Sequence, residues 1–247
     1  MKRVVRAFCM GLGMFTALPC PYRPWAEEDR GLMIACLPVV GTVIGLIWAV
    51  LALLGRWLLP RPLDAALIAA LPFLLTGFIH LDGFMDACDA LLSWRPLEER
   101  LRILKDSATG AFAVVSLAML LLFSFAAAQA VDPAALRALA LVPVVSRCGS
   151  AISVSALRPL DRSEYARLPG SAARCAAIAV IYLIAMLAGA LWLGRYVLAL
   201  AAETLVYTAA MVWAVRTLKG VSGDLAGFAL SLAETGALIA LAILSKG

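Results

Sequence analysis

Three aspartates, Asp82, Asp86 and Asp89, lie within eight residues of the segment TGFIHLDGFMDACDALL, directly after a very apolar run. At 100° per residue they fall within an arc of about 60°, on one edge of a helix. Two unit charges ~4 Å apart repel by about 4 kcal/mol at an effective dielectric near 20. The cluster therefore favours either a retained proton or a divalent cation. Hard oxygen ligands suit Mg²⁺ or Mn²⁺, and Mg²⁺ is commonly held by one or two carboxylates together with substrate phosphates. We predict a metal site for a diphosphate; the alternative is a solvated helix face.

Two further polar residues lie where they could act beside this edge. His80 is the only histidine, and we expect it in the turn that enters the aspartate helix, as an acid/base, a phosphate donor or a structural residue. Arg147, next to Ser146 in PVVSRCGS, is a charge inside an apolar run. Such charges usually pair with another group or line a polar cavity, so Arg147 is expected either to contact phosphate or to form a structural ion pair.

A third segment, KGVSGDLAGFALSLAE from Lys219 to Glu234, opens the last apolar run. Free N–H groups at a helix start favour anions, and Gly223 allows close approach. Asp224 stands where a helix N-cap is expected. Glu234 lies about 15 Å deeper along the helix, in apolar surroundings, which is harder to explain as a structural feature. Asp106 and Ser107 form a similar turn before another apolar run, with Asp106 as its expected cap.

The positions of these residues depend on the secondary-structure elements that carry them, and the composition of the chain limits which elements are possible. The chain has 247 residues, 64% of them hydrophobic, and a mean hydropathy of +0.95. Soluble domains contain about 45–50% apolar residues, so a water-soluble globule is excluded. About 20 apolar residues span a bilayer core. We therefore predict an all-α, polytopic membrane bundle forming one domain, residues 1–247. Seven runs qualify, the second being short and containing Pro72: residues 32–55, 64–80, 108–129, 138–157, 175–194, 197–215 and 225–244.

The first apolar patch, Val4 to Pro19, is too short for a span and has no signal-peptide cleavage pattern. We expect a retained helix that lies in the interface or re-enters the membrane. Two short helices are also expected on the cytoplasmic side, one over 82–92 and one starting near Pro96. The six cysteines are scattered and show neither zinc-site nor disulfide spacing.

The net charge of +5 comes from residues between the apolar runs, which argues against nucleic acid as a partner and for membrane lipid. If the N-terminus is cytoplasmic, the inner segments carry 15 of the 21 lysines and arginines, as the positive-inside rule requires. These segments are 1–31, 81–107, 158–174 and 216–224. The aspartate edge then lies on the cytoplasmic face, which is the side where nucleotides are found.

The chain resembles the cobalamin synthase family, the adenosylcobinamide-GDP ribazoletransferases. The matching pieces follow the family's order over nearly the whole chain. They are FTALPCP (15–21), LPVVGTVIG (37–45), TGFIHLDGFMDACDA (76–90), LRILKDSATGAFAV (101–114), VSR (145–147) and SGDLAG with the later Glu (222–234).

The resemblance implies a multi-pass enzyme of the bacterial inner membrane that completes cobalamin biosynthesis. It would transfer the adenosylcobinamide phosphate group of adenosylcobinamide-GDP to α-ribazole or its 5′-phosphate, releasing GMP with Mg²⁺ or Mn²⁺. Asp82, Asp86 and Asp89 are then the metal ligands. The expected catalytic residues are His80, Lys105, Asp106, Arg147 and Glu234, with the base among His80, Asp106 and Glu234. The expected substrate-binding residues are Gly83, Arg102, Ser107, Gly110, Ser146, Gly223 and Asp224.

Three departures from the family pattern involve four positions. Ala90 replaces a usual Gly, Val221-Ser222 replaces Gln-Thr, and Ser231 stands where a Glu is common. The last two changes bear on recognition of the nucleophile. Rival interpretations are a CDP-alcohol phosphotransferase, whose Ala-Arg element is absent here, a cation transporter, and a non-catalytic membrane scaffold. The protein partners considered are a second copy of the chain, in a homo-oligomer, and other enzymes of the cobalamin pathway, in a complex.

Overall fold

The computed structural model describes residues 2–20, 22, 25–160, 165, 168 and 170–246. Within these ranges, the long apolar stretches with helix-favouring residues form helices. Within these ranges the only strand-like pairing is an isolated bridge between Pro159 and Val221. The α-helices are α1 (Lys2–Phe15), α2 (Arg30–Ala35), α3 (Leu37–Leu58), α4 (Leu63–Leu75), α5 (Ile79–Leu92), α6 (Leu97–Ile103), α7 (Ala111–Ala130), α8 (Val142–Ala156), α9 (Ala172–Leu193), α10 (Val197–Leu218) and α11 (Gly223–Leu244). The 3₁₀ helices are η1 (Glu27–Asp29), η2 (Pro133–Ala140) and η3 (Gly194–Tyr196).

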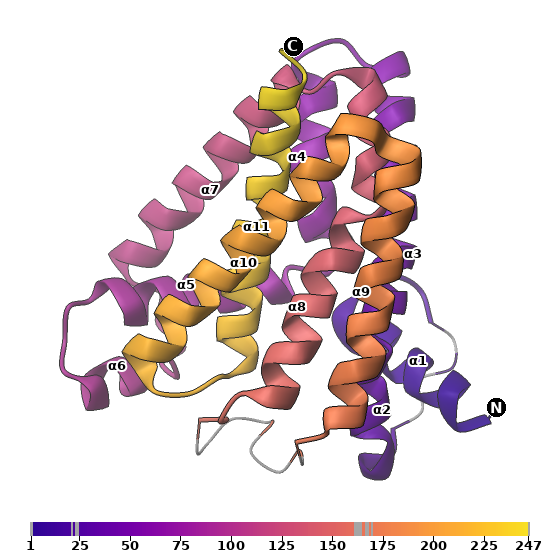
Figure 1. The fold of residues 1–247 in the computed structure, drawn as a ribbon. Coiled ribbons are helices and arrows are strands. Elements are labelled where there is room, and N and C mark those ends of the chain that lie inside the picture. Colours follow the sequence, from indigo (N-terminus) through magenta and orange to yellow (C-terminus); the bar gives the residue numbers. More distant parts are fainter. Residues whose placement is uncertain are drawn as a thin grey trace.

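A polytopic helical membrane protein is confirmed. Five described segments are long and apolar enough to cross a bilayer, or six if α4 and α5 together form one span. One of the five, 172–218, contains both α9 and α10, which run in opposite directions in Figure 1. The predicted number of seven spans is reached only when α9 and α10 are counted as two spans and the α4–α5 pair is counted as one.

The predicted second span, 64–80, is wrong in its extent. α4 has 13 residues, which is about 20 Å of helix and less than a bilayer core. Gly77 and Phe78 then adopt φ values of 59° and 65°, a left-handed conformation that ends the helix. The chain bends by 90° into α5. The aspartate helix therefore lies across the bundle instead of continuing its axis (Figure 1).

The predicted inner segments gather at one end of the bundle. Figure 1 shows α1, α2, α6 and the turn between α10 and α11 at its lower end, with the C-terminus at the upper end. α1 agrees with the expected short N-terminal helix, and α6 follows Pro96 as predicted, with Pro96 as its N-cap. Pro21 and most of residues 161–169, within two of the predicted segments, lie outside the described residues.

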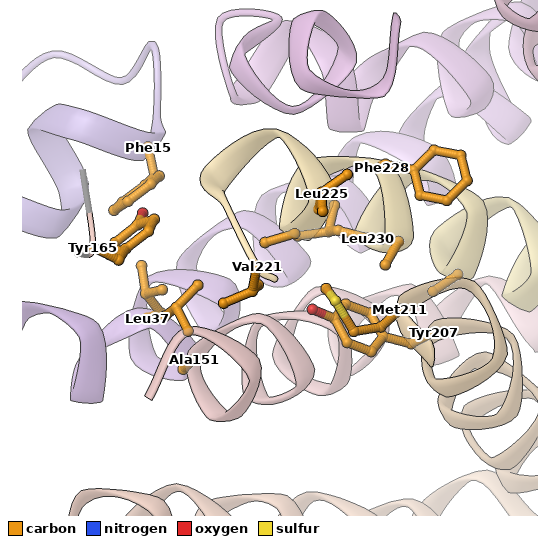
Figure 2. Close-up of a cluster of buried hydrophobic side chains, with 14 of the residues drawn as sticks. Phe15, Leu37, Ala151, Tyr165, Tyr207, Met211, Val221, Leu225, Phe228 and Leu230 are labelled. Atoms are coloured by element: carbon orange, nitrogen blue, oxygen red, sulfur yellow. The ribbon is translucent and has the colours of Figure 1, made fainter. Parts of the chain in front are cut away.

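One apolar cluster connects this end of the bundle to its middle. It includes Phe15 of α1, Leu37 of α3, Ala151 of α8, Met211 of α10 and Leu225 of α11, all buried. Figure 2 shows these side chains converging between their helices. The cluster fixes α11 against α5 and α8, and these three helices carry the polar residues singled out in the sequence.

Candidate active site

Small residues allow α5 and α11 to pack closely beside the predicted site. A Cβ atom on Gly83 would lie 2.8 Å from Asp224 Cα, and one on Gly227 would lie 3.0 Å from the His80 carbonyl oxygen. The Ser231 hydroxyl donates to that same carbonyl at 3.4 Å. Gly83, predicted to bind substrate, thus permits the helix contact that brings Asp224 to the aspartate edge. Ser231, where the family often has Glu, joins the same contact.

This contact borders a cavity of about 130 Å³, the inner cavity. Five of its lining residues are predicted site residues, from three helices: His80, Asp82, Arg147, Gly223 and Asp224. The structure therefore brings together groups up to 144 positions apart in the sequence.

His80 belongs to the first turn of α5, which starts at Ile79, so its predicted place in an entry turn is wrong. Its ring stacks on Phe15 of α1, with centroids 6.2 Å apart and planes at 11°. The Nε2 atom is buried and has no hydrogen-bond partner in the described part of the chain. A buried polar atom without a partner costs about 1–3 kcal/mol, so its position at a cavity indicates a place for a ligand.

Arg147 is both an ion-pair partner and a cavity residue, so neither sequence alternative excludes the other. Its side chain is buried, and Nη1 pairs with Glu234 Oε1 and donates to Ser146 Oγ at 3.0 Å. Ser146 Oγ in turn donates to Glu234 at 2.9 Å. Nη2 is buried without a hydrogen-bond partner among the described residues. The guanidinium is therefore held on one side and open on the other, as a phosphate-binding group requires.

Glu203, on α10, is a buried acid whose role the sequence did not indicate, beyond being acidic in an apolar run. It has no solvent exposure, and its carboxylate lies close enough to Arg147 and Glu234 to interact electrostatically. One arginine thus faces two buried glutamates. Because an unpaired buried charge costs several kcal/mol, the cluster depends on Arg147.

The three aspartates of α5 occupy different environments. Asp82 is exposed, Asp86 is half-buried and Asp89 is buried. Asp89 accepts hydrogen bonds from the backbone N–H groups of Gly110 at 2.6 Å and Ala113 at 2.9 Å. It therefore caps the start of α7, using both carboxylate oxygens. Gly110, predicted to bind substrate, is the N-cap residue that this carboxylate contacts.

Two predicted caps are wrong. Asp106 accepts from Ala108 N at 3.0 Å within its own turn and does not cap α7, because Asp89 does. The N-cap of α11 is Ser222, which accepts from Leu225 N at 3.3 Å, and Asp224 falls in the first helical turn. The Asp224 carboxylate accepts a hydrogen bond from the Ser222 hydroxyl at 3.3 Å.

No three His, Cys, Asp or Glu side chains in the described ranges are grouped so that they alone could hold a metal ion. Asp86 is nevertheless within electrostatic range of both Asp82 and Asp224. Asp224 likewise interacts with Asp82. The arrangement is a cluster of carboxylates from two helices, not a preassembled set of ligands.

A second, larger hollow of about 820 Å³, the outer cavity, opens beside α6. Four predicted site residues line it: Arg102, Lys105, Asp106 and Ser107. Arg102 donates to Glu99 at 3.1 and 2.7 Å, and this lowers the pKa of the Glu99 carboxyl. Nine of the fifteen predicted site residues thus line one or the other of these two cavities.

Comparison with known proteins matches this chain to a family. A family model described as cobalamin-5-phosphate synthase matches residues 7–242. A Clostridium perfringens SM101 protein named adenosylcobinamide-GDP ribazoletransferase is 34% identical over 99% of this chain and its own full length. A protein of the same name from Geotalea daltonii is 32% identical over 96% of this chain and 97% of its own. No solved structure matches.

Proposed function

Because this chain belongs to the cobalamin-5-phosphate synthase family, we propose that it is an adenosylcobinamide-GDP ribazoletransferase whose reaction takes place at the inner cavity. The reaction joins α-ribazole, or its 5′-phosphate, to the adenosylcobinamide phosphate group and releases GMP. The observation that carries the assignment to this cavity is the convergence of His80, Asp82, Arg147 and Asp224 on it. The rival interpretations are set aside by the family match.

The bond changes define what these side chains must do. A ribose oxygen of α-ribazole forms a bond to the phosphorus attached to the cobinamide, and the bond from that phosphorus to the bridging oxygen breaks. GMP leaves with the bridging oxygen. Because a 5′-phosphate is retained in the product when it is present in the substrate, the attacking group is another ribose hydroxyl. Its proton must pass to a base as the new bond forms.

His80 is the best-placed base. Its buried Nε2 has no partner in the described chain, whereas Glu234 is engaged by Arg147 and Ser146, and Asp106 lies in an exposed turn. Stacking on Phe15 holds the ring in place. The open Nη2 of Arg147 donates to a phosphoryl oxygen, where negative charge is spread in phosphoryl transfer.

Mg²⁺ fits the carboxylate cluster when the substrate supplies the remaining ligands. Asp82 and Asp86, with Asp224 opposite, offer oxygens, whereas both oxygens of Asp89 are used at α7. One or two carboxylates plus phosphate oxygens is the usual Mg²⁺ arrangement. The ion would neutralise charge on the diphosphate. Mn²⁺ suits the same ligands.

We propose further that the protein sits in the bacterial inner membrane with this end of the bundle in the cytoplasm. The positive residues at that end and the need for a nucleotide substrate support this orientation. Labelling of single cysteines from each side of sealed vesicles tests it. Protection of an introduced cysteine at Lys105 from periplasmic reagent is expected, and labelling there would contradict it.

The activity test uses membranes containing the full chain, adenosylcobinamide-GDP, Mg²⁺, and either α-ribazole or its 5′-phosphate. Corrinoid product and GMP are expected in equal amounts. Asp82→Asn/Asp86→Asn is expected to lose activity, and raised Mg²⁺ or Mn²⁺ restores part of it in the single variants. Asp132→Asn, at the other end of the bundle, is the matched control and should remain active. No product from wild type, or full activity in the double variant, would refute the assignment.

A further inference from the structure

We propose that the outer cavity is the binding site for the nucleotide half of the substrate, and that Arg158 and Lys219 hold its phosphate. The inference rests on the proposed function, because it assigns one part of that substrate to a place. Neither residue was among the site residues predicted from the sequence.

Size separates the two cavities. Small-molecule pockets usually measure about 300–1,000 Å³, and the outer cavity, at about 820 Å³, lies within that range. The inner cavity, at about 130 Å³, is too small for a nucleotide but suits a few reacting atoms. A substrate with a nucleotide at one end of a diphosphate therefore places that end in the outer cavity.

The turn between α10 and α11 borders both cavities, because Lys219 lines the outer cavity while Gly223 and Asp224 line the inner one. Lys105 lines the outer cavity, and its ammonium group lies within electrostatic range of Asp224, which lines the inner cavity. A diphosphate crossing this border would have Lys105 on one side and Arg147 on the other. The geometry thus matches a ligand that occupies both spaces at once.

Charge and apolar surface in the outer cavity fit a nucleotide better than a simple anion. Four cations line it, Arg102, Lys105, Arg158 and Lys219, against two acids. In the described part of the chain no carboxylate lies within ion-pair distance of Lys105, Arg158 or Lys219. Leucines from α6 and α10 form apolar walls against which a base and ribose can pack.

Backbone contacts hold together the two segments that carry the new cations. Val221 N donates to Arg158 O, and Leu160 N donates to Val221 O, both at 2.9 Å. A Cβ on Gly220 would lie 2.7 Å from the Leu160 side chain, so the two strands of chain approach closely. Lys219 ends α10 with φ 63°, a left-handed conformation that is uncommon for residues other than glycine.

Direct nucleotide binding tests the proposal without requiring catalysis. The protein, purified in lipid nanodiscs, is titrated with GMP and separately with inorganic phosphate at fixed ionic strength. The variants are Arg158→Gln and Lys219→Asn, since asparagine tolerates the left-handed conformation. Arg216→Gln is the control, an exposed cation one turn before Lys219 that does not line the cavity.

Each single variant is expected to weaken GMP binding about tenfold, and the pair more than either alone, as lost charge-assisted hydrogen bonds predict. GMP should bind wild type more tightly than inorganic phosphate. In turnover, KM for the nucleotide substrate should rise while kcat and the KM for α-ribazole stay near wild type. Unchanged GMP affinity in the double variant, or an equal loss in Arg216→Gln, would overturn the proposal.

The result also separates this proposal from the proposed function. Failure of wild type to make product, with GMP binding that depends on Arg158 and Lys219, would refute the assigned reaction and keep the nucleotide site. Normal turnover with GMP binding independent of both residues would refute the nucleotide site alone.

Discussion

The inner and outer cavities use the same kinds of charged residue in opposite ways. In the inner cavity Arg147 is buried and tied to Glu234 and Ser146, with one nitrogen left open. In the outer cavity Arg158 and Lys219 stand at an open surface without an ion-pair partner in the described chain. Because the inner-cavity residues are buried, the stability of each depends on its partners. The exposed cations of the outer cavity do not depend on one another in this way. Substitutions should therefore affect folding and chemistry in the inner cavity, and mainly binding in the outer one.

The largest effect is expected for Arg147→Met. Removing the guanidinium leaves Glu203 and Glu234 buried without a counter-charge, and breaking a buried ion pair from one side costs about 3–5 kcal/mol. Denaturant unfolding in detergent micelles should show this loss, together with absence of activity. Arg147→Met/Glu234→Gln should recover part of the stability and none of the activity. If Arg147→Met were as stable as wild type, the two cavities would not differ in the way described.

His80→Gln should affect chemistry without a comparable loss of stability. Loss of a general base lowers the rate by about 10²–10⁴-fold, and glutamine retains much of the size of the ring. Rapid-quench measurement of GMP release reports the chemical step. Asp106→Asn, in the outer cavity, is the comparison and should change the rate less than tenfold. The reverse order of effects would transfer the role of base to Asp106.

The Asp89 variants decide whether this residue is a metal ligand or a helix cap. Asp89→Ala removes the acceptor of two backbone N–H groups at the start of α7, at a cost of about 1.5–3 kcal/mol. Asp89→Asn keeps one acceptor and should recover part of that loss. The Mg²⁺ concentration for half-maximal activity should not change in Asp89→Asn, whereas it should rise in Asp86→Asn. A similar rise in the half-maximal Mg²⁺ concentration in both variants would show that Asp89 is a metal ligand.

The sequence could predict the residue types of the site but not their grouping. Helical periodicity placed Asp82, Asp86 and Asp89 on one edge, and in the structure they lie on one helix, α5. It could not show that Asp89 faces the start of α7, because that depends on packing between helices far apart in the chain. The bend at Gly77 and Phe78 was hidden for a similar reason, since Phe78 carries no sequence signal for a left-handed conformation.

Charge within apolar runs was the more reliable signal. Arg147 and Glu234 were singled out by that feature before the family resemblance was considered, and they are paired in the structure. Glu203 had the same feature, yet its nearness to them depends on how α10 packs, which periodicity does not reveal. Arg158 and Lys219 were counted among the positive residues of the inner segments, and the outer cavity that they line, with the close contact of residues 158–160 with 220–221, indicates another role.

The smallest change in stability is expected for substitution of Asp29. The arginines that pair with it are partly exposed, as the cations of the outer cavity are. Arg3 donates to its carboxylate at 2.8 Å and Arg6 at 2.6 Å, and these bonds, the Arg3 contribution first, lower the pKa of the Asp29 carboxyl. A carboxyl group whose pKa is lower in the folded state than in the unfolded state stabilises the fold at pH values above its unfolded-state pKa, near 3.9. This stabilisation is lost as the pH falls through the folded-state pKa. Asp29→Asn should therefore be slightly less stable than wild type at pH 7, and the difference should shrink below about pH 4. High salt should reduce it further, because both arginines are partly exposed. Unfolding temperatures of the two proteins at pH 3, 5 and 7 measure the effect, and a difference that grew on acidification would contradict the assigned direction.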